Sequence, residues 1–465
     1  MSPHHSRVAL AAALLASLAG ARAPLHAETP GQLDPAFGGG DGIYVFEPSA
    51  TATHANVLDV AAAPDGKLFL AGSVLAGGYD NLACRIVASA GEIVCHVVPF
   101  DFGGTDNDSA NAIAVGSDNK PVVAGTADGP AADPDSRAVF VRFSTGFSFD
   151  STFDGDGKVD DIDFPFPFGA TAVAVLPNGK VAWAGYIDQT SRHMLVGRLL
   201  QNGSLDTTFD GDGYRVVIFD AGGDFADEAR DIAVQDDGKL VVVGYANTGA
   251  PNSSSGDFAI ARLNTNGSLD TSFSGDGKVL VSFEDVDGPP DHATNVAVDR
   301  FGRIVVAGIT AGKVDVARLL PDGALDPSFG GGDGKVSFSI LSINDVRSEP
   351  DLLLLPGDSI LIAGDFDPGG ADLEDSFVAV LERDGDLDPT FGGGDGKVTY
   401  GTLPQMSDPA PSFGGAALVA GKVVVGGDGG FAESDLAFAL RIWMSGLFRD
   451  DFETGDALEW SAASN

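Results

Sequence analysis

Four segments in the middle of the chain decide the fold: DGKLVVVG at residues 237–244, FAIARL at 258–263, LDTSFSGDG at 269–277 and KVLVSF at 278–283. A further apolar run, DIAVQ at 231–235, precedes them. Asp-Gly between two apolar runs is the strongest short signal for a β-hairpin. The stretch therefore predicts four short antiparallel strands, here called a to d, joined by tight turns.

This unit recurs with a period of about 60 residues, which is typical of a repeat fold. Seven hairpin segments end near a glycine: Gly72, Gly125, Gly185, Gly244, Gly308, Gly364 and Gly426. The turn between strands c and d recurs as LDPAFGGGDG (33–42), FDSTFDGDG (149–157), LDTTFDGDG (205–213), LDTSFSGDG (269–277), LDPSFGGGDG (325–334) and LDPTFGGGDG (387–396). Seven four-stranded sheets packed radially bury each face against a neighbour. We therefore expect an all-β fold, a seven-bladed β-propeller of four-stranded antiparallel blades, over residues 28–445.

The two ends of the repeat region complement each other. The seventh unit stops after its c strand, LAFALRIWM at 436–444, whereas the chain begins with an unpaired LDPAFGGGDG turn and the strand IYVFE at 43–47. An N-terminal strand that completes the last blade removes two exposed sheet edges at once. The sequence therefore predicts that the propeller is closed by its N-terminal strand.

The LDxxF turn and its period resemble the delta-60 repeat family of bacterial secreted proteins, whose units carry an LDxxFGxxGxV signature. The resemblance covers residues 33–444 and implies a β-propeller, but it brings no established activity. The last twenty residues, 446–465, resemble the FxDGFESG...W tails of exported proteobacterial proteins, with Asp451 in place of that tail's Gly. We interpret this tail either as a sorting or surface-attachment segment or as a degenerate eighth turn motif on the closing blade.

Charge and the N-terminus indicate where the protein acts. The chain has 27 Lys and Arg against 67 Asp and Glu, a net charge of -40, which would repel nucleic acid and anionic lipid. Residues 1–27 contain Arg7 and an apolar run from Val8 to Ala21, as in a secretory signal peptide cleaved after Ala21 or Ala27. No stretch reaches the roughly 20 apolar residues of a membrane-spanning helix. We expect an exported, monomeric protein of the periplasm, cell surface or medium.

The two cysteines, Cys84 and Cys95, are symmetric about a turn at Ser89 and Ala90 in the one blade that lacks the LDxxF motif. This spacing places them opposite each other on a c–d hairpin. In an exported protein the pattern predicts a disulfide that replaces the missing turn.

The c–d turns allow two interpretations. Asp154 with Asp156, and Asp210 with Asp212, have the spacing that opens a calcium-binding loop, although no bidentate Glu follows. Alternatively, the turns are structural: glycines supply positive φ, the Asp side chains cap the turn, and a phenylalanine fills the gap between blades. The phenylalanines in question are Phe37, Phe153, Phe209, Phe273, Phe329 and Phe391.

An arginine precedes the motif's Asp by eight residues in four copies, and Val380 breaks the pattern in a fifth. The pairs are Arg142 with Asp150, Arg198 with Asp206, Arg262 with Asp270, and Arg318 with Asp326. A ring of arginines facing the channel would suit a substrate, whereas half-buried ion pairs within each blade need only local geometry. We favour the ion pairs.

Variation along the repeats predicts a binding face. The a–b and c–d turns are uniform, whereas the b–c and d–a loops, which meet on the opposite face, differ in length and composition, as recognition loops on a rigid frame do. The candidate contacts are Asp160, Asp161, Asp163, Phe164, Phe166, Phe168, Asp365, Asp367, Asp372, Glu374 and Asp375. The three phenylalanines alternatively pack beneath their own loop.

We therefore expect a binding or interaction scaffold for a protein or glycan ligand. The alternative is a propeller-fold enzyme of the cell envelope, of the polysaccharide lyase, glycosidase or quinone-dependent dehydrogenase type. No GxSxG, HExxH or GxxxxGK[ST] motif is present, and no catalytic residue or cofactor follows from the sequence beyond the calcium candidate.

Overall fold

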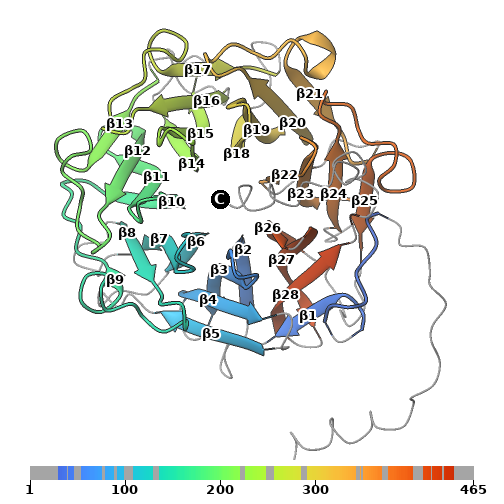
Figure 1. Cartoon of the computed structure of the whole chain (residues 1–465), viewed down its shortest axis with the longest axis horizontal. Helices are drawn as coiled ribbons and strands as arrows, with labels where there is room; N and C mark the ends of the chain where they lie inside the picture. Colours follow the sequence, from blue (N-terminus) through green and yellow to red (C-terminus); the bar gives the residue numbers. More distant parts are fainter. Residues whose placement is uncertain are drawn as a thin grey trace, which may run out of the picture.

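The computed structural model describes residues 30–38, 40–46, 54–75, 79–87, 92–98, 108–128, 136–219, 226–247, 256–283, 291–341, 346, 349–368, 375–401, 412–419, 421–431, 434–442 and 444. Within them the chain forms seven four-stranded antiparallel sheets around a central axis (Figure 1), which confirms the seven-bladed propeller. The predicted signal peptide at 1–27 and the tail at 446–465 lie outside the described residues. In the described part, no helix has the length and apolar character needed to cross a bilayer.

The blades follow one another in sequence, each with strands a to d from the axis outward. Blade 1 contains β2 (His54–Ala62), β3 (Leu68–Leu75), β4 (Tyr79–Val87) and β5 (Glu92–Val98). Blade 2 contains β6 (Ser109–Val115), β7 (Pro121–Ala127), β8 (Arg137–Arg142) and β9 (Lys158–Val159). Blade 3 contains β10 (Phe168–Val175), β11 (Val181–Asp188), β12 (Arg192–Leu199) and β13 (Tyr214–Val217). Blade 4 contains β14 (Asp227–Val234), β15 (Leu240–Asn247), β16 (Gly256–Leu263) and β17 (Lys278–Val281).

Blades 5 to 7 complete the ring. Blade 5 contains β18 (His292–Val298), β19 (Ile304–Thr310), β20 (Lys313–Leu319) and β21 (Lys335–Phe338), with a short 3-10 helix η1 (Gly330–Gly332) in its c–d turn. Blade 6 contains β22 (Asp351–Leu354), β23 (Ile360–Phe366), β24 (Asp375–Leu381) and β25 (Lys397–Tyr400). Blade 7 contains β26 (Ser412–Val419), β27 (Lys422–Phe431), β28 (Ser434–Ile442) and, as its outer strand, β1 (Ile43–Phe46).

The LDxxF motif forms a compact turn that reaches into the next blade interface. In blade 4, Asp270 N–H donates to the carbonyl of Arg262 at 2.8 Å, and Phe273 N–H donates to the carbonyl of Asp270 at 2.9 Å. Ser274 has φ 52°, the left-handed region in which other copies place Gly or Asp. The six motif phenylalanines are at most 2% exposed, so they fill the gaps between blades as expected: Phe37, Phe153, Phe209, Phe273, Phe329 and Phe391.

The N-terminal segment closes the ring. Strand β1 pairs antiparallel with β28, from Ile43 opposite Leu440 to Phe46 opposite Ala437. Asp34 N–H also donates to the carbonyl of Arg441 at 2.8 Å. The two ends of the repeat region therefore share one sheet, which confirms the predicted closure; Figure 1 shows β1 beside β28.

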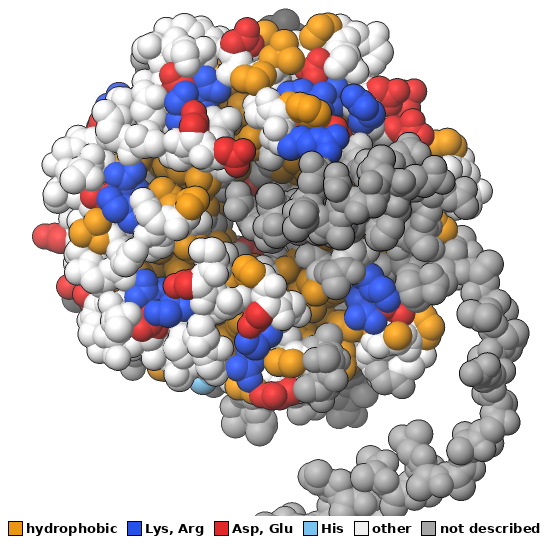
Figure 2. Space-filling view, in the orientation of Figure 1, with side chains coloured by type: hydrophobic (Ala, Val, Ile, Leu, Met, Phe, Trp, Pro, Cys, Tyr) orange, Lys and Arg blue, Asp and Glu red, His pale blue; other side chains and the backbone are white. Residues whose placement is uncertain are grey.

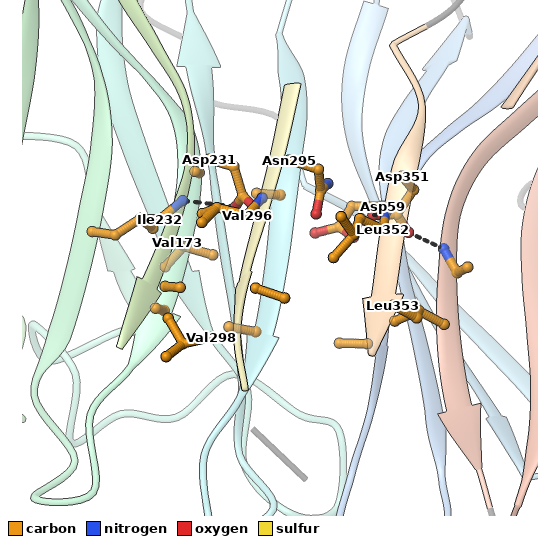
Figure 3. Close-up of a pocket in the computed structure, with 18 of the residues that line it drawn as sticks. Asp59, Val173, Asp231, Ile232, Asn295, Val296, Val298, Asp351, Leu352 and Leu353 are labelled. Atoms are coloured by element: carbon orange, nitrogen blue, oxygen red, sulfur yellow. Dashed lines mark hydrogen bonds between the residues drawn. The ribbon is translucent and has the colours of Figure 1, made fainter. Parts of the chain in front are cut away.

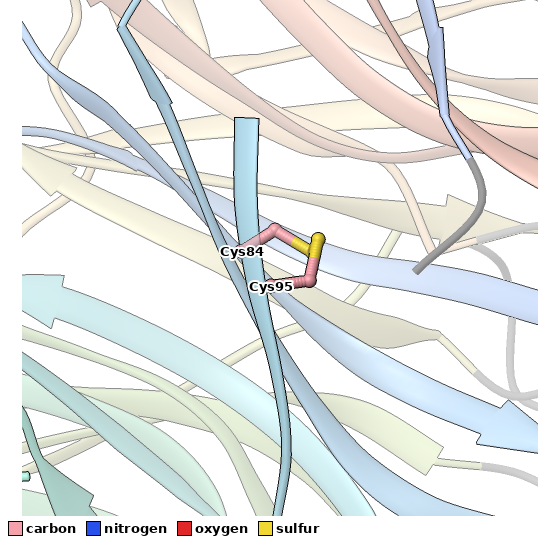
Figure 4. The surroundings of a disulfide bond; sticks show 2 residues. All are labelled: Cys84 and Cys95. Atoms are coloured by element: carbon pink, nitrogen blue, oxygen red, sulfur yellow. A yellow bond between two sulfur atoms is a disulfide. The ribbon is translucent and has the colours of Figure 1, made fainter. Parts of the chain in front are cut away.

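The predicted disulfide is present in blade 1 (Figure 4). Cys84 on β4 lies opposite Cys95 on β5, with their Cα atoms 4.1 Å apart and the sulfurs bonded. The bond links the two outer strands of the blade whose c–d connection has no LDxxF turn. A disulfide persists in oxidising compartments, so this feature is consistent with an extracellular or periplasmic protein.

The arginine and aspartate pairs are buried ion pairs, as predicted. The Nε atoms of Arg142, Arg198, Arg262 and Arg318 lie 2.6–2.9 Å from the carboxylates of Asp150, Asp206, Asp270 and Asp326. Each guanidinium also covers the motif phenylalanine at 4.6–4.7 Å and donates to a backbone carbonyl of the next blade. These arginines join blades rather than face a ligand.

The lysine of the a–b hairpin contacts the same aspartate as the arginine does. The sequence did not predict this third member of the ion-pair cluster. Lys180 lies 2.7 Å from Asp206, the partner of Arg198. In the closing blade, Lys422 and Arg441 each lie 2.6 Å from Asp34, so the N-terminal motif supplies a fifth pair. Figure 2 shows Lys and Arg side chains beside acids at intervals around one face of the ring.

Candidate functional site

The inner strands of the seven blades enclose a central channel with a volume of about 2380 Å³. They are β2, β6, β10, β14, β18, β22 and β26 (Figure 1). Six of them contain a β-bulge, as at Arg230 between Ala229 and Asp231. A bulge redirects side chains, so polar groups of these strands can turn toward the neighbouring blade or the channel.

Three aspartates of the inner strands hold neighbouring blades together (Figure 3): Asp59 and Asp231 directly follow a bulge, and Asp351 is the first residue of β22. Asp59 accepts the N–H of Ile113 in the next blade at 2.7 Å, and Asp231 accepts that of Val296 at 2.7 Å. The Asp351 carboxylate accepts the N–H of its own neighbour Leu352 at 2.8 Å and that of Ala416, in the next blade, at 2.5 Å. These carboxylates therefore link blade 1 to 2, blade 4 to 5 and blade 6 to 7.

Bonds of the opposite polarity link three other pairs of blades. Asn111 Nδ2 donates to the carbonyl of Ala170 at 2.8 Å, and Thr171 Oγ1 donates to that of Ala229 at 2.8 Å. Thr294 Oγ1 donates to the carbonyl of Pro350 at 2.8 Å. At the last junction, between blades 7 and 1, a Cβ on Gly414 would lie 1.7 Å from the carbonyl oxygen of Val57, so the strands approach too closely for a side chain. The polar ring around the channel is therefore a structural feature.

The aspartates of this ring have perturbed acidities. Burial, with the charge of Asp351 next in importance, raises the pKa of Asp59 to about 8. Burial also raises the pKa of Asp351 to about 7 and that of Asp231 to about 6, against the backbone N–H donors, which lower both. Deprotonation of the three groups therefore places unfavourable charge in the wall of one channel.

A different cluster of charged and aromatic side chains lies where the channel opens toward the variable loops. At the start of β14, Glu228 is 5% exposed, and its carboxylate lies 2.7 Å from Arg192 Nη1 and 3.3 Å from Arg230 Nη1. The hydroxyl of Tyr245 donates to the same carboxylate at 3.3 Å. Arg230 also lies 3.4 Å from Glu349 of blade 6. We call Arg192, Glu228, Arg230, Tyr245 and their aromatic neighbours Tyr186 and His292 the mouth cluster.

Aromatic rings support the two guanidinium groups. Arg192 covers the ring of Tyr186 at 4.0 Å, and Arg230 lies 5.7 Å from the ring of Tyr245. The imidazole of His292 stacks on the ring of Tyr245, with the two ring centroids 4.6 Å apart. Burial lowers the pKa of His292, with a further contribution from Arg230, so this imidazole is neutral at neutral pH.

Local structure explains how residues of three blades meet here. The tight b–c hairpin of blade 3 turns between Asp188 and Arg192, whose guanidinium binds Asp188 at 2.8 and 2.9 Å. Glu228 and Arg230 lie on either side of Ala229 of β14, and the bulge falls between Ala229 and Asp231. Hydrogen bonds to Asp188 and Glu228, together with the charges of these carboxylates, raise the pKa of Arg192 against burial, which lowers it, so the guanidinium stays charged. Two guanidinium donors, a carboxylate acceptor and flat rings therefore converge at one mouth of the channel.

The calcium candidates have contacts that suit the structural interpretation of the turns. Asp156 accepts the N–H of Lys158 at 2.9 Å, and Asp212 accepts that of Tyr214 at 3.2 Å. Asp210 lies 3.1 Å from Arg215. Asp154 is exposed, and burial together with the charges of Asp161, Asp156 and Asp160 raises its pKa. The described residues contain no group of three or more His, Cys, Asp or Glu side chains arranged for a metal ion, and the calcium hypothesis stays a prediction.

The predicted binding-face residues are only partly at the surface. Asp161, Asp163 and Phe166 are exposed, and Asp160, Asp367 and Asp375 are half-buried. Phe168 is 2% exposed and lies 4.3 Å from Phe164, so these two rings pack beneath their loop. Asp372 and Glu374 lie outside the described residues. Their role in binding stays a prediction.

Asp365 differs from the other predicted contacts because it is 1% exposed. Its Oδ1 accepts hydrogen bonds from Ser376 Oγ and Phe413 N–H at 2.8 Å, and its Oδ2 accepts one from Ser412 Oγ at 2.8 Å. The carboxylate therefore joins blades 6 and 7 beneath the variable loops.

The comparison with protein families agrees with the propeller fold. Residues 176–209, 235–273, 302–329 and 358–391 match the family described as a domain of unknown function (DUF5122) beta-propeller. A search of curated proteins gives no match. Among solved structures, a protein of unknown function from Dyadobacter fermentans is 12% identical, with 86% of this chain and 98% of that chain covered and a TM-score of 0.44.

Two enzymes are among the other similar structures. Virginiamycin B lyase from Staphylococcus aureus is 12% identical, with 86% of this chain and 99% of that chain covered and a TM-score of 0.45. The NanB sialidase from Streptococcus pneumoniae is 10% identical, with 86% and 70% covered and a TM-score of 0.45. At these identities and TM-scores no activity transfers to this chain.

Proposed function

We propose that the chain is an exported binding protein whose ligand is a glycan, held at the mouth cluster on the side of the variable loops. The supporting observation is Arg230, which lines the channel with 28% of its side chain exposed while it contacts both Glu228 and Glu349. Sugar hydroxyls both donate and accept hydrogen bonds, so adjacent guanidinium and carboxylate groups suit them. A pocket with a few convergent polar groups beside aromatic rings is the usual form of a small-ligand site.

The surrounding surface supports recognition on this side. The loops that border the mouth differ between blades, whereas the opposite face repeats the same ion-pair cluster, and binding sites lie preferentially on variable loops held by a rigid frame. The disulfide between Cys84 and Cys95 suits a protein that works outside the cytoplasm. The acidic residues of the 160–163 and 365–375 loops extend the proposed contact surface.

A glycan array followed by calorimetric titration of the best ligand tests this function. Arg230→Met should weaken binding roughly 10- to 100-fold, because a hydrogen bond to a charged group is worth about 1.5–3 kcal/mol. Arg300→Met is the matched control, since Arg300 lines the same channel among the a–b turns and is 55% exposed. No glycan binding, or equal affinity of the Arg230 variant and wild type, would refute the proposal. A peptide array run in parallel detects a protein ligand instead.

The second candidate function is an envelope enzyme at the same site. The observation in its favour is the 3.3 Å contact between the hydroxyl of Tyr245 and Glu228, beside two arginines that would stabilise negative charge. A panel of glycosidase and lyase substrates tests it. Turnover that disappears in Glu228→Gln and in Tyr245→Phe would establish catalysis there, whereas binding without turnover leaves the scaffold function.

A further inference from the structure

Blade 5 contains a buried carboxylate that has no counterpart in the other blades. In the b–c strand pair, Asp315 lies opposite Gly308. In blade 7 the equivalent glycine is Gly427, which pairs with the residue before the bulge. The residues opposite this glycine in the other six blades are apolar: Leu82, Val139, Leu195, Ala259, Phe377 and Phe438. Asp315 is 0% exposed. Because six blades fill this position with hydrocarbon, the propeller itself does not require a carboxylate there.

A second buried acid lies in the same interface. Ala317 and Leu319 alternate with Asp315 along β20 and pack on blade 4, next to Phe258 and Val281. Asp291, 2% exposed, immediately precedes β18, and its Oδ2 accepts the N–H of Phe283 at 2.7 Å. The charge of Asp291 is among the causes that raise the pKa of Asp315. In the strand register, Asp291 directly precedes His292, which lies opposite Ile309, and Asp315 lies opposite Gly308, so both carboxylates belong to the same end of the blade 5 sheet.

The oxygens of Asp315 are not satisfied by well-aligned hydrogen bonds. Among the described residues, neither Oδ1 nor Oδ2 has a hydrogen-bond partner, and Thr310 Oγ1, on a residue that is 1% exposed, has none there either. The hydroxyls of Ser337 and Thr310 are near enough to lower the pKa of Asp315, as does the charge of Lys313 to a smaller extent, yet burial raises it to about 6. At neutral pH the group is therefore mostly ionised, in a place where an unsatisfied charge is strongly unfavourable.

Asp365 shows what a satisfied buried aspartate looks like in this protein. It is as deeply buried, at 1% exposed, but three donors from Ser376, Ser412 and Phe413 surround its two oxygens. Blade 5 has no such arrangement around Asp315 among the described residues. The nearby hydroxyls of Thr310 and Ser337 and the charge of Lys313 leave the burial of Asp315 only partly offset, so a bound positive charge would complete its surroundings.

We propose that Asp291 and Asp315, with the hydroxyls of Thr310 and Ser337, bind a hard divalent cation between blades 4 and 5. Carboxylate and hydroxyl oxygens are the ligands that calcium accepts, and two aspartates balance its charge. The cation joins the b–c hairpin of blade 5 to the beginning of its inner strand and fixes this part of the variable-loop face. The site uses none of the turn aspartates of blades 2 and 3 and none of the six residues of the mouth cluster, although Asp291 directly precedes His292.

Metal analysis and thermal melts of the whole mature protein test the site. We expect one divalent cation per chain by elemental analysis of protein purified without chelator. Calcium added to chelator-treated protein should raise Tm by roughly 2–5 °C if it exceeds its Kd about 100-fold. Two variants remove the ligand: Asp315→Leu restores the residue of blades 1 and 3, and Asp315→Asn keeps the shape if the leucine variant does not fold.

A matched control separates this site from the turn candidates. The double variant Asp154→Asn with Asp210→Asn removes the exposed acids of two c–d turns and should retain the bound cation and the calcium-dependent rise in Tm. Loss of both in the Asp315 variants together with their retention in this control supports the proposal. The proposal is overturned if wild type contains no cation and its Tm does not change with calcium or chelator. It is also overturned if the calcium-dependent rise in Tm persists in the Asp315 variants, or if this rise disappears in the turn double variant.

Discussion

Phe37→Ala is the most direct test of how the propeller closes. Phe37 is 2% exposed and packs in the cluster that joins blade 7 to blade 1, with the ring of Tyr44 at 4.7 Å and the guanidinium of Arg441 at 4.8 Å. Truncation of a buried phenylalanine costs about 3–5 kcal/mol. A folded domain is stable by only about 5–15 kcal/mol, so this loss is a large part of the total.

Chemical denaturation and hydrogen exchange measure the two consequences. The free energy of unfolding should fall by the amount above, and the amides of Ile43–Phe46 should lose protection in β1 before the rest of blade 7 does. Phe273→Ala is the matched control, because Phe273 is 0% exposed under Arg262 at 4.6 Å but sits between two internal blades. It should destabilise the protein similarly while β1 stays protected.

An exposed phenylalanine sets the baseline for these measurements. Phe301 is 55% exposed, so Phe301→Ala should change the free energy of unfolding by less than about 0.5 kcal/mol. The closure argument is refuted if Phe37→Ala costs less than about 1 kcal/mol, or if the exchange of β1 is the same in Phe37→Ala and Phe273→Ala.

The fold was predictable because the repeat multiplies a weak signal. One hairpin pattern such as DGKLVVVG at 237–244 is ambiguous alone, but seven copies in register with a turn motif specify the number of blades. The pairing of Arg262 with Asp270 was predictable for the same reason. The pair Arg441 with Asp34 was not recognised, because its members lie at opposite ends of the chain and meet only after the ring closes.

The candidate site was not predictable because it is the part of the molecule that breaks the repeat. Arg192, Glu228 and Tyr245 come from two neighbouring blades, and each is one charged or aromatic residue among many in variable segments. Their convergence depends on the bulge at Arg230 and on a tight hairpin, neither of which changes the apolar pattern of the strands. The burial of Asp365 was not predictable either, because sequence alone does not show that serines of two blades enclose it.

Three further outcomes follow from the contacts of the fold. Replacing Cys84 and Cys95 by Ser should lower the free energy of unfolding, measured by chemical denaturation, by about 2–4 kcal/mol, because the disulfide closes a loop across a sequence separation of 11. A loss below about 0.5 kcal/mol would show that the stability of blade 1 does not depend on the disulfide. Arg262→Met removes the closest charged partner of the buried Asp270, at 2.8 Å, and leaves Lys239 at 3.2 Å. We therefore expect a loss of about 3–5 kcal/mol, against little change in the Arg300→Met control, whose side chain is 55% exposed. Stability should also fall as pH rises from about 4 to about 8, because the folded pKa values of Asp59 and Asp351, about 8 and about 7, lie above the ordinary 3.8. A raised carboxyl pKa stabilises the fold while the group is protonated and loses that contribution as the pH passes the folded value. The free energy of unfolding should therefore depend less on pH across this window in the double variant Asp59→Asn with Asp351→Asn than in wild type. The same dependence of the unfolding free energy on pH in both proteins would mean that the channel aspartates titrate normally.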